Sequence, residues 1–349
     1  MRWFLRFLAV VLVLGIAAAA GVLWWGWESL HEPYRQHDGE VRIEIRSGRS
    51  ATGILEELAE KGVLANALTA RVYLVHKLKD PPLQAGEYVF EEPLNTPQVL
   101  DKLIRGEVVT YPVTVIEGFT LEETAQVLAE AGFGDEETFR QEMQRADLVS
   151  DFDTEAEDLE GYLYPDTYRF ARGATEGEIV AAMVENFKRR FQTEVEPLMA
   201  EYGGTVRELV TLASIVEKEA QKVDERAVIA SVYSNRLRIG MALQADPTTI
   251  YAFKRLGTWN GNLRRPDLKL DSPYNTYVYP GLPPGPICSP RVANMVASAK
   301  PADTPYFYFV SRNDGTHVFA RTYEEHQRNV NEWQKRYWRR KWAEERRSK

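Results

Sequence analysis

Two glutamates, Glu217 and Glu219, lie in an apolar segment at residues 209–220 (LVTLASIVEKEA) and are the first candidates for acid–base chemistry. On a helix of about 3.6 residues per turn, this segment has one apolar stripe that we expect to be buried. The stripe comprises Leu209, Leu212, Ala213, Val216 and Ala220. Both glutamates flank it, on opposite sides. A carboxyl group at the margin of a core is partly desolvated, which raises its pKa as a general acid near neutral pH requires.

Periodicity does not choose between Glu217 and Glu219. The alternative interpretation, which we would prefer for an arbitrary helix, is that both glutamates are ordinary residues at the boundary of the core. The same pattern predicts that the polar residues of the segment point away from the core, namely Thr211, Ser214 and Lys218.

Polar and aromatic residues gather in the stretches after this segment, which we expect to be loops. They are residues 235–237 (NRL), 244–248 (QADPT), 274–277 (YNTY) and 281–285 (GLPPG). Ring faces stack on the C–H groups of a pyranose, and amides pair with hydroxyl and N-acetyl groups, so the set suits a sugar polymer. Turns are rich in the same residue types, which makes each stretch alone a weak indication.

Bulk composition narrows the class of protein. The chain has 349 residues and a formal net charge of −8, so it is a poor candidate for binding nucleic acid, which needs clustered Lys and Arg. Its single cysteine, Cys288, cannot form an intrachain disulfide or a cysteine-based metal site. The sequence lacks an HExxH motif, a Walker loop and a GxGxxG motif after a strand. We therefore expect chemistry that needs no metal and no cofactor.

Helices and one hairpin must position these residues. Periodicity and turn residues predict helices at residues 96–105, 176–202, 205–220 and 224–237, a hairpin formed by 306–310 and 317–319, and a helix from Thr322 to the end. Residues 257–290 are dense in Gly, Pro, Asn and Tyr. An irregular stretch of that length inside a compact domain is usually functional.

A strand–turn–helix unit occurs twice in the first half of the chain, at residues 41–62 and at residues 113–132. The copies agree in the turn glycine, the Ser or Thr that caps the helix, and the closing glycine. The matched pairs are Gly48 with Gly118, Ser50 with Thr120, and Gly62 with Gly132. Such units are common, so a chance likeness is the alternative to one module used twice. Between the copies, residues 83–90 predict a further strand.

The N-terminus carries an uncharged apolar run at residues 7–27, preceded by Arg2 and Arg6 and closed by tryptophans. About 20 apolar residues span the hydrocarbon layer, and tryptophans suit its interface. By the positive-inside rule, the arginines keep the N-terminus in the cytoplasm and the rest of the chain is exported. A cleaved signal peptide is the alternative, because residues 17–20 are alanines. In both cases the remainder works outside the cytoplasm.

These signals predict an α+β protein in five parts. The parts are a transmembrane anchor at residues 1–27, a polar linker at 28–40, a small α+β subdomain at 41–110, a larger mixed α/β domain with the helix-borne glutamate at 111–330, and a basic C-terminal helix at 331–349. The basic and aromatic tail suits an anionic lipid or polymer surface. A solvated terminal helix is the alternative.

Six blocks occur in an order and spacing that are typical of one protein family. They are residues 159–168 (LEGYLYPDTY), 213–219 (ASIVEKE), 232–241 (VYSNRLRIGM), 243–248 (LQADPT), 274–277 (YNTY) and 281–287 (GLPPGPI). The chain thereby resembles the MltG/YceG family of endolytic murein transglycosylases. Residues 304–310 (TPYFYFV) and 315–319 (GTHVF) fit the same pattern, so that nearly the whole chain is covered. Cys288 lies where the family pattern requires no cysteine.

The resemblance implies a catalytic acid, which it places on the second glutamate of the Glu-Lys-Glu motif, Glu219. This carboxyl would protonate the glycosidic oxygen between N-acetylmuramic acid and N-acetylglucosamine in peptidoglycan. It would then take the proton from the C6 hydroxyl of the same muramic residue, whose oxygen closes on C1 to give a 1,6-anhydro end. One carboxyl in both steps fits the lack of a convincing second carboxylate, since a typical glycosidase uses two.

The resemblance also implies which side chains bind substrate. These are Gln244, Asp246, Thr248, Tyr274, Asn275, Tyr277 and His317. Asp246 equally suits a turn cap that holds Gln244, and His317 equally suits a hydrogen-bonded structural role. The subdomain at residues 41–110 is similar to a LysM-like subdomain, which would help to hold glycan.

The predicted function is an endolytic lytic transglycosylase, a lyase that cuts nascent glycan strands at the inner membrane and limits their length. The expected partners are peptidoglycan glycan strands, the inner membrane through the N-terminal helix, and peptidoglycan synthases, with no nucleic acid. A muramidase-type hydrolase of the same bond is one alternative. A non-catalytic wall-binding scaffold is another.

Overall fold

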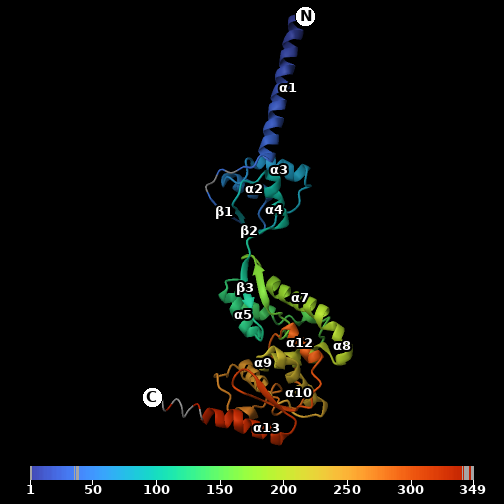
Figure 1. The fold of residues 1–349 in the computed structure, drawn as a ribbon. Coiled ribbons are helices and arrows are strands. Elements are labelled where there is room, and N and C mark those ends of the chain that lie inside the picture. The colour runs from blue at the N-terminus through green and yellow to red at the C-terminus, as the bar shows by residue number, and fades with distance from the viewer. Residues whose placement is uncertain (1, 35, 37–38, 340, 342–345, 347–349) are drawn as a thin grey trace. The chain divides into compact units, whose positions relative to one another are not determined.

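The structure is a computed structural model that describes residues 2–34, 36, 39–339, 341 and 346. Helices dominate in these described residues, where the strands pair in three two-stranded sheets, so the protein is of mixed α+β class (Figure 1). The chain divides into two compact units, each with its own hydrophobic core. The first unit is Met1–Tyr111 with Arg169–Ala174, and the second is Pro112–Tyr168 with Thr175–Lys349.

The first unit is a small α+β fold preceded by a long apolar helix. Its elements are α1 (Arg2–His31), β1 (Val41–Ile45), α2 (Ala51–Glu60), α3 (Ala67–His76), β2 (Gly86–Phe90) and α4 (Thr96–Arg105). β1 and β2 pair antiparallel, with Ile43 opposite Tyr88, and both side chains are buried in the core. The predicted strand before Phe90 and the predicted helix at residues 96–105 are confirmed. α3 was not predicted, because its apolar residues do not form one stripe.

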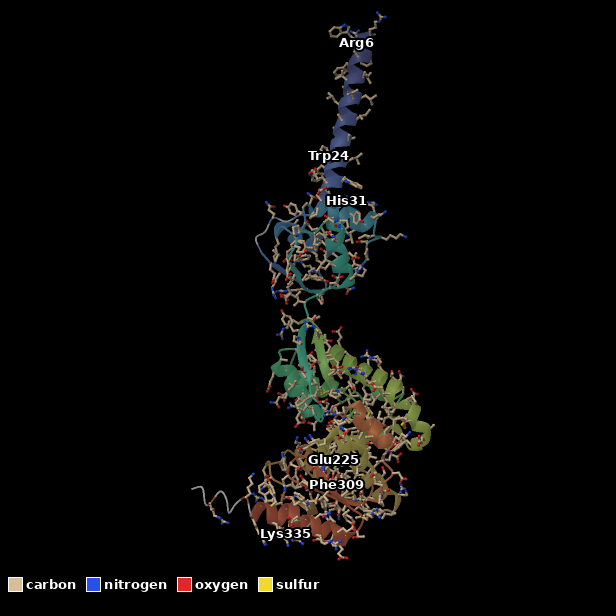
Figure 2. All side chains as sticks on the ribbon, viewed as in Figure 1. Arg6, Trp24, His31, Glu225, Phe309 and Lys335 are labelled. Carbon is tan, nitrogen blue, oxygen red and sulfur yellow. The ribbon has the colours of Figure 1, made fainter. Side chains whose placement is uncertain are left out.

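In the part of the chain that the structure describes, α1 is the one helix whose length and apolar composition would let it cross a membrane. Its apolar side chains between Arg6 and Trp24, both labelled in Figure 2, are exposed. An N-terminal signal sequence can satisfy the same criteria of length and apolar composition, so this finding leaves both interpretations of the apolar run open.

The C-terminal end of α1 packs against the small subdomain of the first unit. The hydroxyl oxygens of Ser29 and Thr69 lie 2.8 Å apart, and the Thr96 hydroxyl donates to the Ser29 carbonyl at 3.1 Å. The helix therefore continues to His31, four residues beyond the anchor expected at 1–27. Part of the expected linker is helical and fixed to α3 and α4.

Both copies of the repeated unit fold as a strand, a turn and a helix. The second copy consists of β3 (Tyr111–Val115) and α5 (Leu121–Glu130). Ser50 caps α2 and Thr120 caps α5, each by accepting a hydrogen bond from the backbone N–H three residues further on. Gly48 and Gly118 both have a φ of 80°, a left-handed conformation that favours glycine. The predicted match of turn and cap is confirmed.

The remaining elements follow in chain order. They are α6 (Glu136–Glu142), η1 (Ala146–Val149), β4 (Asp166–Phe170), α7 (Glu176–Glu194), α8 (Glu196–Tyr202), α9 (Val206–Glu219), η2 (Val223–Glu225), α10 (Arg226–Arg238), α11 (Asp246–Arg255), η3 (Asp267–Lys269), α12 (Val292–Ala299), β5 (Tyr308–Ser311), β6 (His317–Ala320), α13 (Tyr323–Val330) and η4 (Asn331–Arg336). β3 pairs with β4, and β5 pairs antiparallel with β6. A core of α9, α10 and α11 side chains, including Leu212, Tyr233 and Tyr251, supports the region described below.

Several predicted elements are confirmed and others need correction. α9, α10 and the β5–β6 hairpin occupy the predicted positions. The single helix expected at residues 176–202 is two helices, because α7 ends at Glu194 and Pro197 lies in the first turn of α8. Residues 246–255, expected to begin as a loop, form α11, with Pro247 in its first turn. Residues 235–237, grouped with the expected loops, lie in the last turn of α10. The last residues of the predicted C-terminal helix lie outside the described part of the chain.

The surroundings of α9 differ from the predicted one-sided burial. Thr211 and Ser214 were expected to point away from the core, but they are 1% and 0% exposed. α12 packs against this side of α9, and Ile287 N donates to the Ser214 hydroxyl at 3.0 Å. The helix is therefore covered on more than one face, which a single amphipathic stripe does not reveal. Lys218 is exposed, as predicted.

Candidate active site

Glu219 is the last residue of α9, and it lines a pocket of about 280 Å³ in the second unit. The pocket wall comes from the ends of α9 and α10, the start of α11, the 274–277 loop, the β5–β6 hairpin and α13. Thr205 caps the first turn of α9, and the helix is buried from Leu209 to Val216, so these contacts hold its last residue in place.

The pocket gives Glu219 the protonation behaviour of a general acid. Burial raises the pKa of Glu219 to about 7, and the negative charge of Asp246 adds to the rise. Two neighbours act in the opposite direction: the Tyr233 hydroxyl, which donates to Glu219 Oε1 at 3.2 Å, and the Arg236 cation. Among the described residues none forms an ion pair with Glu219. The carboxyl can therefore hold a transferable proton near neutral pH.

Glu217 lies in a different environment, on the side of α9 that faces α12. Its side chain is 4% exposed, and Arg291 Nε and Nη2 donate to its Oε1 at 3.0 and 2.9 Å. The second carboxylate oxygen accepts from Asn294 Nδ2 at 2.7 Å and from Arg291 N at 2.9 Å. Both oxygens are occupied in tying α9 to α12. Helical periodicity does not distinguish Glu217 from Glu219, but the residues that surround the two side chains in the structure differ.

Two loop segments, residues 243–248 and 274–277, are fastened to each other beside the pocket. Ala245 N donates to the Thr276 hydroxyl at 3.0 Å, whose oxygen lies 2.9 Å from that of Thr248. Asn275 Nδ2 donates to two carbonyls of its own loop, at residues 268 and 270. Thr248 and Asn275 are 0% exposed and do not line the pocket. Their contacts hold the loops that carry the pocket residues.

Gln244, Asp246 and Tyr277 line the pocket together with Glu219. The Tyr277 hydroxyl donates to Asp246 Oδ1 at 2.6 Å. Gln244 has a φ of 49°, a left-handed conformation that is uncommon outside glycine and that often occurs at functional sites. Asp246 is the first residue of α11, directly after its N-cap residue Ala245.

Tyr274 contacts residues of α11 and does not line the pocket. Its ring centroid lies 5.0 Å from that of Tyr251, and Arg255 Nη1 donates to its hydroxyl at 3.1 Å. It is absent from the pocket wall formed by the described residues. Of the seven side chains expected to bind substrate, the structure therefore brings four to Glu219 and leaves three outside the pocket.

His317 lines the pocket and is also hydrogen-bonded within the protein. Its Nδ1 lies 2.7 Å from Glu225 Oε2, and its backbone N–H donates to Glu225 Oε1 at 2.8 Å. The two roles that the sequence left open for His317, in the cleft and in the structure, are therefore both compatible with its position.

Comparison with known proteins identifies the family. Residues 43–332 match the YceG-like family. The chain belongs to this family.

The relatives of this YceG-like chain extend over most of its length. It is 33% identical over 316 residues to the endolytic murein transglycosylase of Bacillus subtilis (strain 168), covering 86% of each chain. It is 32% identical over 327 residues to the endolytic murein transglycosylase of Streptococcus pneumoniae serotype 2 (strain D39), covering 84% of this chain and 58% of that protein. A crystal structure of a yceG-like protein from Listeria monocytogenes matches with a TM-score of 0.57 and 31% identity, covering 84% of this chain and 99% of that chain.

The pocket of this YceG-like protein contains residues that the sequence analysis did not single out. They are Tyr233, Tyr308, Tyr323 and His326, and Arg236 from the polar stretch at 235–237 lines the pocket beside them. Arg236 Nε donates to the Phe307 carbonyl at 2.6 Å, and the guanidinium lies 5.3 Å from the centroid of the Tyr308 ring. His326 stacks on Tyr308 with a centroid distance of 5.1 Å. Burial, aided by Arg236, lowers the pKa of His326.

A sequence signal exists for some of these missed residues. Tyr233 and Arg236 lie three residues apart inside the block at 232–241, so they share one face of the predicted helix. Tyr323 and His326 belong to no block. Only the packing of α13 against the hairpin brings them to the pocket.

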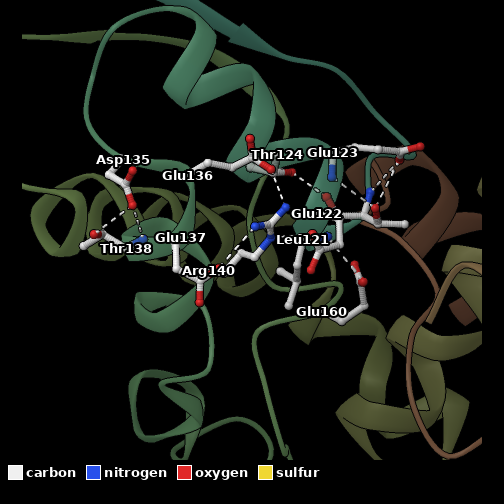
Figure 3. A network of polar contacts seen from close by, with 11 residues as sticks. Leu121, Glu122, Glu123, Thr124, Asp135, Glu136, Glu137, Thr138, Arg140 and Glu160 are labelled. Carbon is white, nitrogen blue, oxygen red and sulfur yellow. Dashed lines mark hydrogen bonds and ion pairs between the residues drawn. The ribbon is translucent and has the colours of Figure 1, made fainter. Parts of the chain in front are cut away.

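A second carboxyl group with a raised pKa lies outside the pocket wall. Glu160 is 4% exposed, and its Oε2 accepts from Leu121 N at 3.3 Å (Figure 3) and from the Tyr251 hydroxyl at 3.0 Å. Burial raises the pKa of Glu160 to about 8, with a contribution from Asp158. Because it joins α5 to α11 and does not line the pocket, we regard it as a structural carboxyl.

No metal-binding arrangement is present within the described ranges, where no group of three or more His, Cys, Asp or Glu side chains could hold an ion. Cys288 is buried, and its Sγ lies 3.4 Å from the Ser214 carbonyl. The described pocket wall carries carboxyl, phenol, guanidinium and imidazole groups.

Proposed function

We propose that this chain is an endolytic lytic transglycosylase, a lyase that cuts the glycan strands of peptidoglycan, with Glu219 as its acid and base. The name endolytic murein transglycosylase of the Bacillus and Streptococcus relatives supports the activity and the substrate. One observation carries the residue assignment: Glu219 lines the pocket, and burial raises its pKa to about 7. Glu217, the other candidate, is held by Arg291.

The proposed reaction moves one proton out of Glu219 and one proton back. The carboxyl protonates the glycosidic oxygen between N-acetylmuramic acid and N-acetylglucosamine, and the bond from C1 to that oxygen breaks. The C6 oxygen of the muramic residue then bonds to C1, and its proton passes to the Glu219 carboxylate. The product is a 1,6-anhydro end, and the enzyme returns to its starting state without consuming water. Since Tyr233 donates to Oε1, we assign the transferable proton to Oε2.

The same proposal gives roles to the other candidate residues. Gln244, Asp246, Tyr277 and His317 contact the saccharide, because they line the pocket with Glu219. Thr248 and Asn275 act indirectly, by holding the loops. Tyr274, beside Arg255, is the candidate for contact with a more distant part of a long strand.

The remaining parts of the proposal concern location and partners. We infer that α1 anchors the chain in the inner membrane with its N-terminus in the cytoplasm, and that both units act outside the cytoplasm. The subdomain at residues 41–110 serves as a LysM-like glycan-holding unit. The enzyme limits the length of nascent strands and acts beside peptidoglycan synthases.

Product analysis tests the activity. Full-length protein in detergent is incubated with peptidoglycan, and the released fragments are identified by mass spectrometry. We expect 1,6-anhydro-muramyl ends from the wild type and fewer, by about a hundredfold or more, from Glu219→Gln, which retains the shape of the side chain but has no transferable proton. Reducing ends in place of anhydro ends would establish a muramidase. A Glu219→Gln protein that restores a deletion strain to normal growth would establish a non-catalytic scaffold.

A further inference from the structure

We propose that Glu225 and His317 act as a pair in the pocket, in which Glu225 orients the imidazole so that Nε2 accepts a hydrogen bond from a hydroxyl group of the bound saccharide. This inference rests on the proposed function, because it assigns a further group to the same substrate. His317 is then a catalytic residue that touches substrate. Glu225 is a positioning residue that acts through it.

Glu225 holds the backbone and the ring of His317 at the same time. Its Oε1 accepts from His317 N at 2.8 Å, and its Oε2 lies 2.7 Å from His317 Nδ1. The two residues come from η2 and from the start of β6, which are far apart in the sequence. Figure 2 labels Glu225 and Phe309, the two residues that contact the imidazole from η2 and from β5.

The carboxylate determines which ring nitrogen is available to a ligand. A carboxylate can only accept a hydrogen bond, so a neutral imidazole beside it carries its proton on Nδ1 and its lone pair on Nε2. With Nδ1 engaged by Glu225, Nε2 is the polar ring atom left to meet a ligand in the pocket. Carboxylate–histidine pairs orient an imidazole in this way at metal sites and in catalytic triads.

The ring contact exceeds what is needed to hold β6 in place. The backbone bond from His317 to Glu225 already joins β6 to η2, and pairing with Ser311 holds the strand from β5. The imidazole is 8% exposed, and the Phe309 ring meets it edge-on at 5.2 Å. A ring fixed on two sides at a pocket wall loses little further rotamer freedom when it binds a ligand.

A saccharide in the pocket needs hydrogen-bond acceptors as well as donors. Near Glu219, the Tyr233 hydroxyl already donates to Glu219 Oε1, and Arg236 Nε donates to the Phe307 carbonyl. A saccharide presents several hydroxyl groups, each of which needs an acceptor when it leaves water. The lone pair of His317 Nε2 would satisfy one of them.

Two isosteric substitutions separate the ring nitrogens. In His317→Asn the amide occupies the place of Nδ1, so it keeps the Glu225 contact and removes Nε2. In His317→Gln the amide reaches the place of Nε2 and gives up the contact with Glu225. We expect His317→Asn to lower kcat about tenfold or more without lowering the unfolding temperature, since a hydrogen bond made to the reacting substrate is lost. His317→Gln keeps a larger share of kcat, and Glu225→Gln lies between them.

His31→Asn provides a matched control, because His31 is the last residue of α1 and lies outside both the pocket wall and residues 41–110. It should leave both kcat and KM unchanged. A His317→Asn protein that cuts glycan strands at the wild-type rate overturns the pair while the role of Glu219 stands. Equal loss in His317→Asn and His317→Gln, accompanied by a lower unfolding temperature, also overturns it, because that result marks a structural histidine.

A binding measurement tests the pair independently of cleavage. Full-length Glu219→Gln protein with ¹⁵N-labelled histidine is titrated with short, uncut glycan strands in detergent. We expect the His317 Nε2 resonance to move on binding while Nδ1 stays protonated. An unmoved Nε2 resonance at saturating glycan overturns the inference. If the wild-type protein releases no fragments, the proposed function is refuted. The response of the Nε2 resonance to glycan would then still show whether Glu225 and His317 act as a pair.

Discussion

The last turn of α9 has two sides that carry the same side chain in different surroundings. On the side that faces α12, Glu217 meets Arg291 and Asn294, and every acceptor oxygen is used. On the side that faces the pocket, Glu219 meets one phenol, and burial raises its pKa to about 7. The difference shows that the Glu-Lys-Glu sequence does not by itself determine which glutamate can act as a general acid. The partner that packing places against each carboxyl decides which one can carry a proton.

The largest expected effect separates the two glutamates by activity. Glu219→Gln should lower glycan cleavage by about a hundredfold or more, because general acid catalysis contributes at least that much. Glu217→Gln should leave the folded protein active, since its carboxyl does not line the pocket. Fragment release per folded molecule, measured by mass spectrometry, checks the pair of variants. Equal activity loss in both would remove the distinction.

The next effect separates them by stability. Glu217→Gln weakens the ion pair with Arg291, whose side chain is 34% exposed, so we expect a loss of about 1–3 kcal/mol in the free energy of unfolding. Glu219→Gln should not destabilise the fold, because a neutral amide replaces a carboxyl that burial disfavours as an ion. Urea unfolding of the two variants provides the test. A Glu217→Gln protein as stable as the wild type would contradict it.

A smaller effect concerns the phenol beside the acid. Tyr233→Phe removes the donor to Glu219 Oε1, which stabilises the carboxylate, so the pKa of Glu219 should rise above about 7. Activity depends on the protonated acid and falls as pH rises through that pKa. The alkaline limb of the pH–rate profile should therefore move to higher pH. Tyr162→Phe, at a buried tyrosine that donates to Asp153 instead, is the control and should leave the limb in place.

A shift of the opposite sign concerns the aspartate beside the acid. Asp246→Asn removes a negative charge that raises the pKa of Glu219, so the alkaline limb should move to lower pH. Tyr277→Phe, which keeps the Asp246 charge and removes only its hydrogen bond, provides the comparison. The test is the pH–rate profile of each variant, recorded on full-length protein at constant ionic strength. A shift in the same direction as that of Tyr233→Phe would contradict the proposed electrostatics.

The sequence alone predicts the family and much of the local structure. Thr205, Ser50 and Thr120 cap their helices through bonds to the third residue on, and Gly48 and Gly118 make the turns. Such features depend on neighbours within a few residues, so a pattern in the sequence records them. The blocks around Glu219 and Gln244 are equally local, and the match to the YceG-like family confirms the resemblance that they carry.

Contacts between distant segments decided the rest. Arg291, which forms the ion pair with Glu217, lies 74 residues from it along the chain. Glu225 and His317 lie 92 residues apart. Thr211 and Ser214 are buried because α12 covers them, and His326 reaches the pocket because α13 packs on the hairpin. Periodicity along one helix has no information about such partners. The chemical type of each pocket residue is therefore a property of the chain, and its surroundings are a property of the fold.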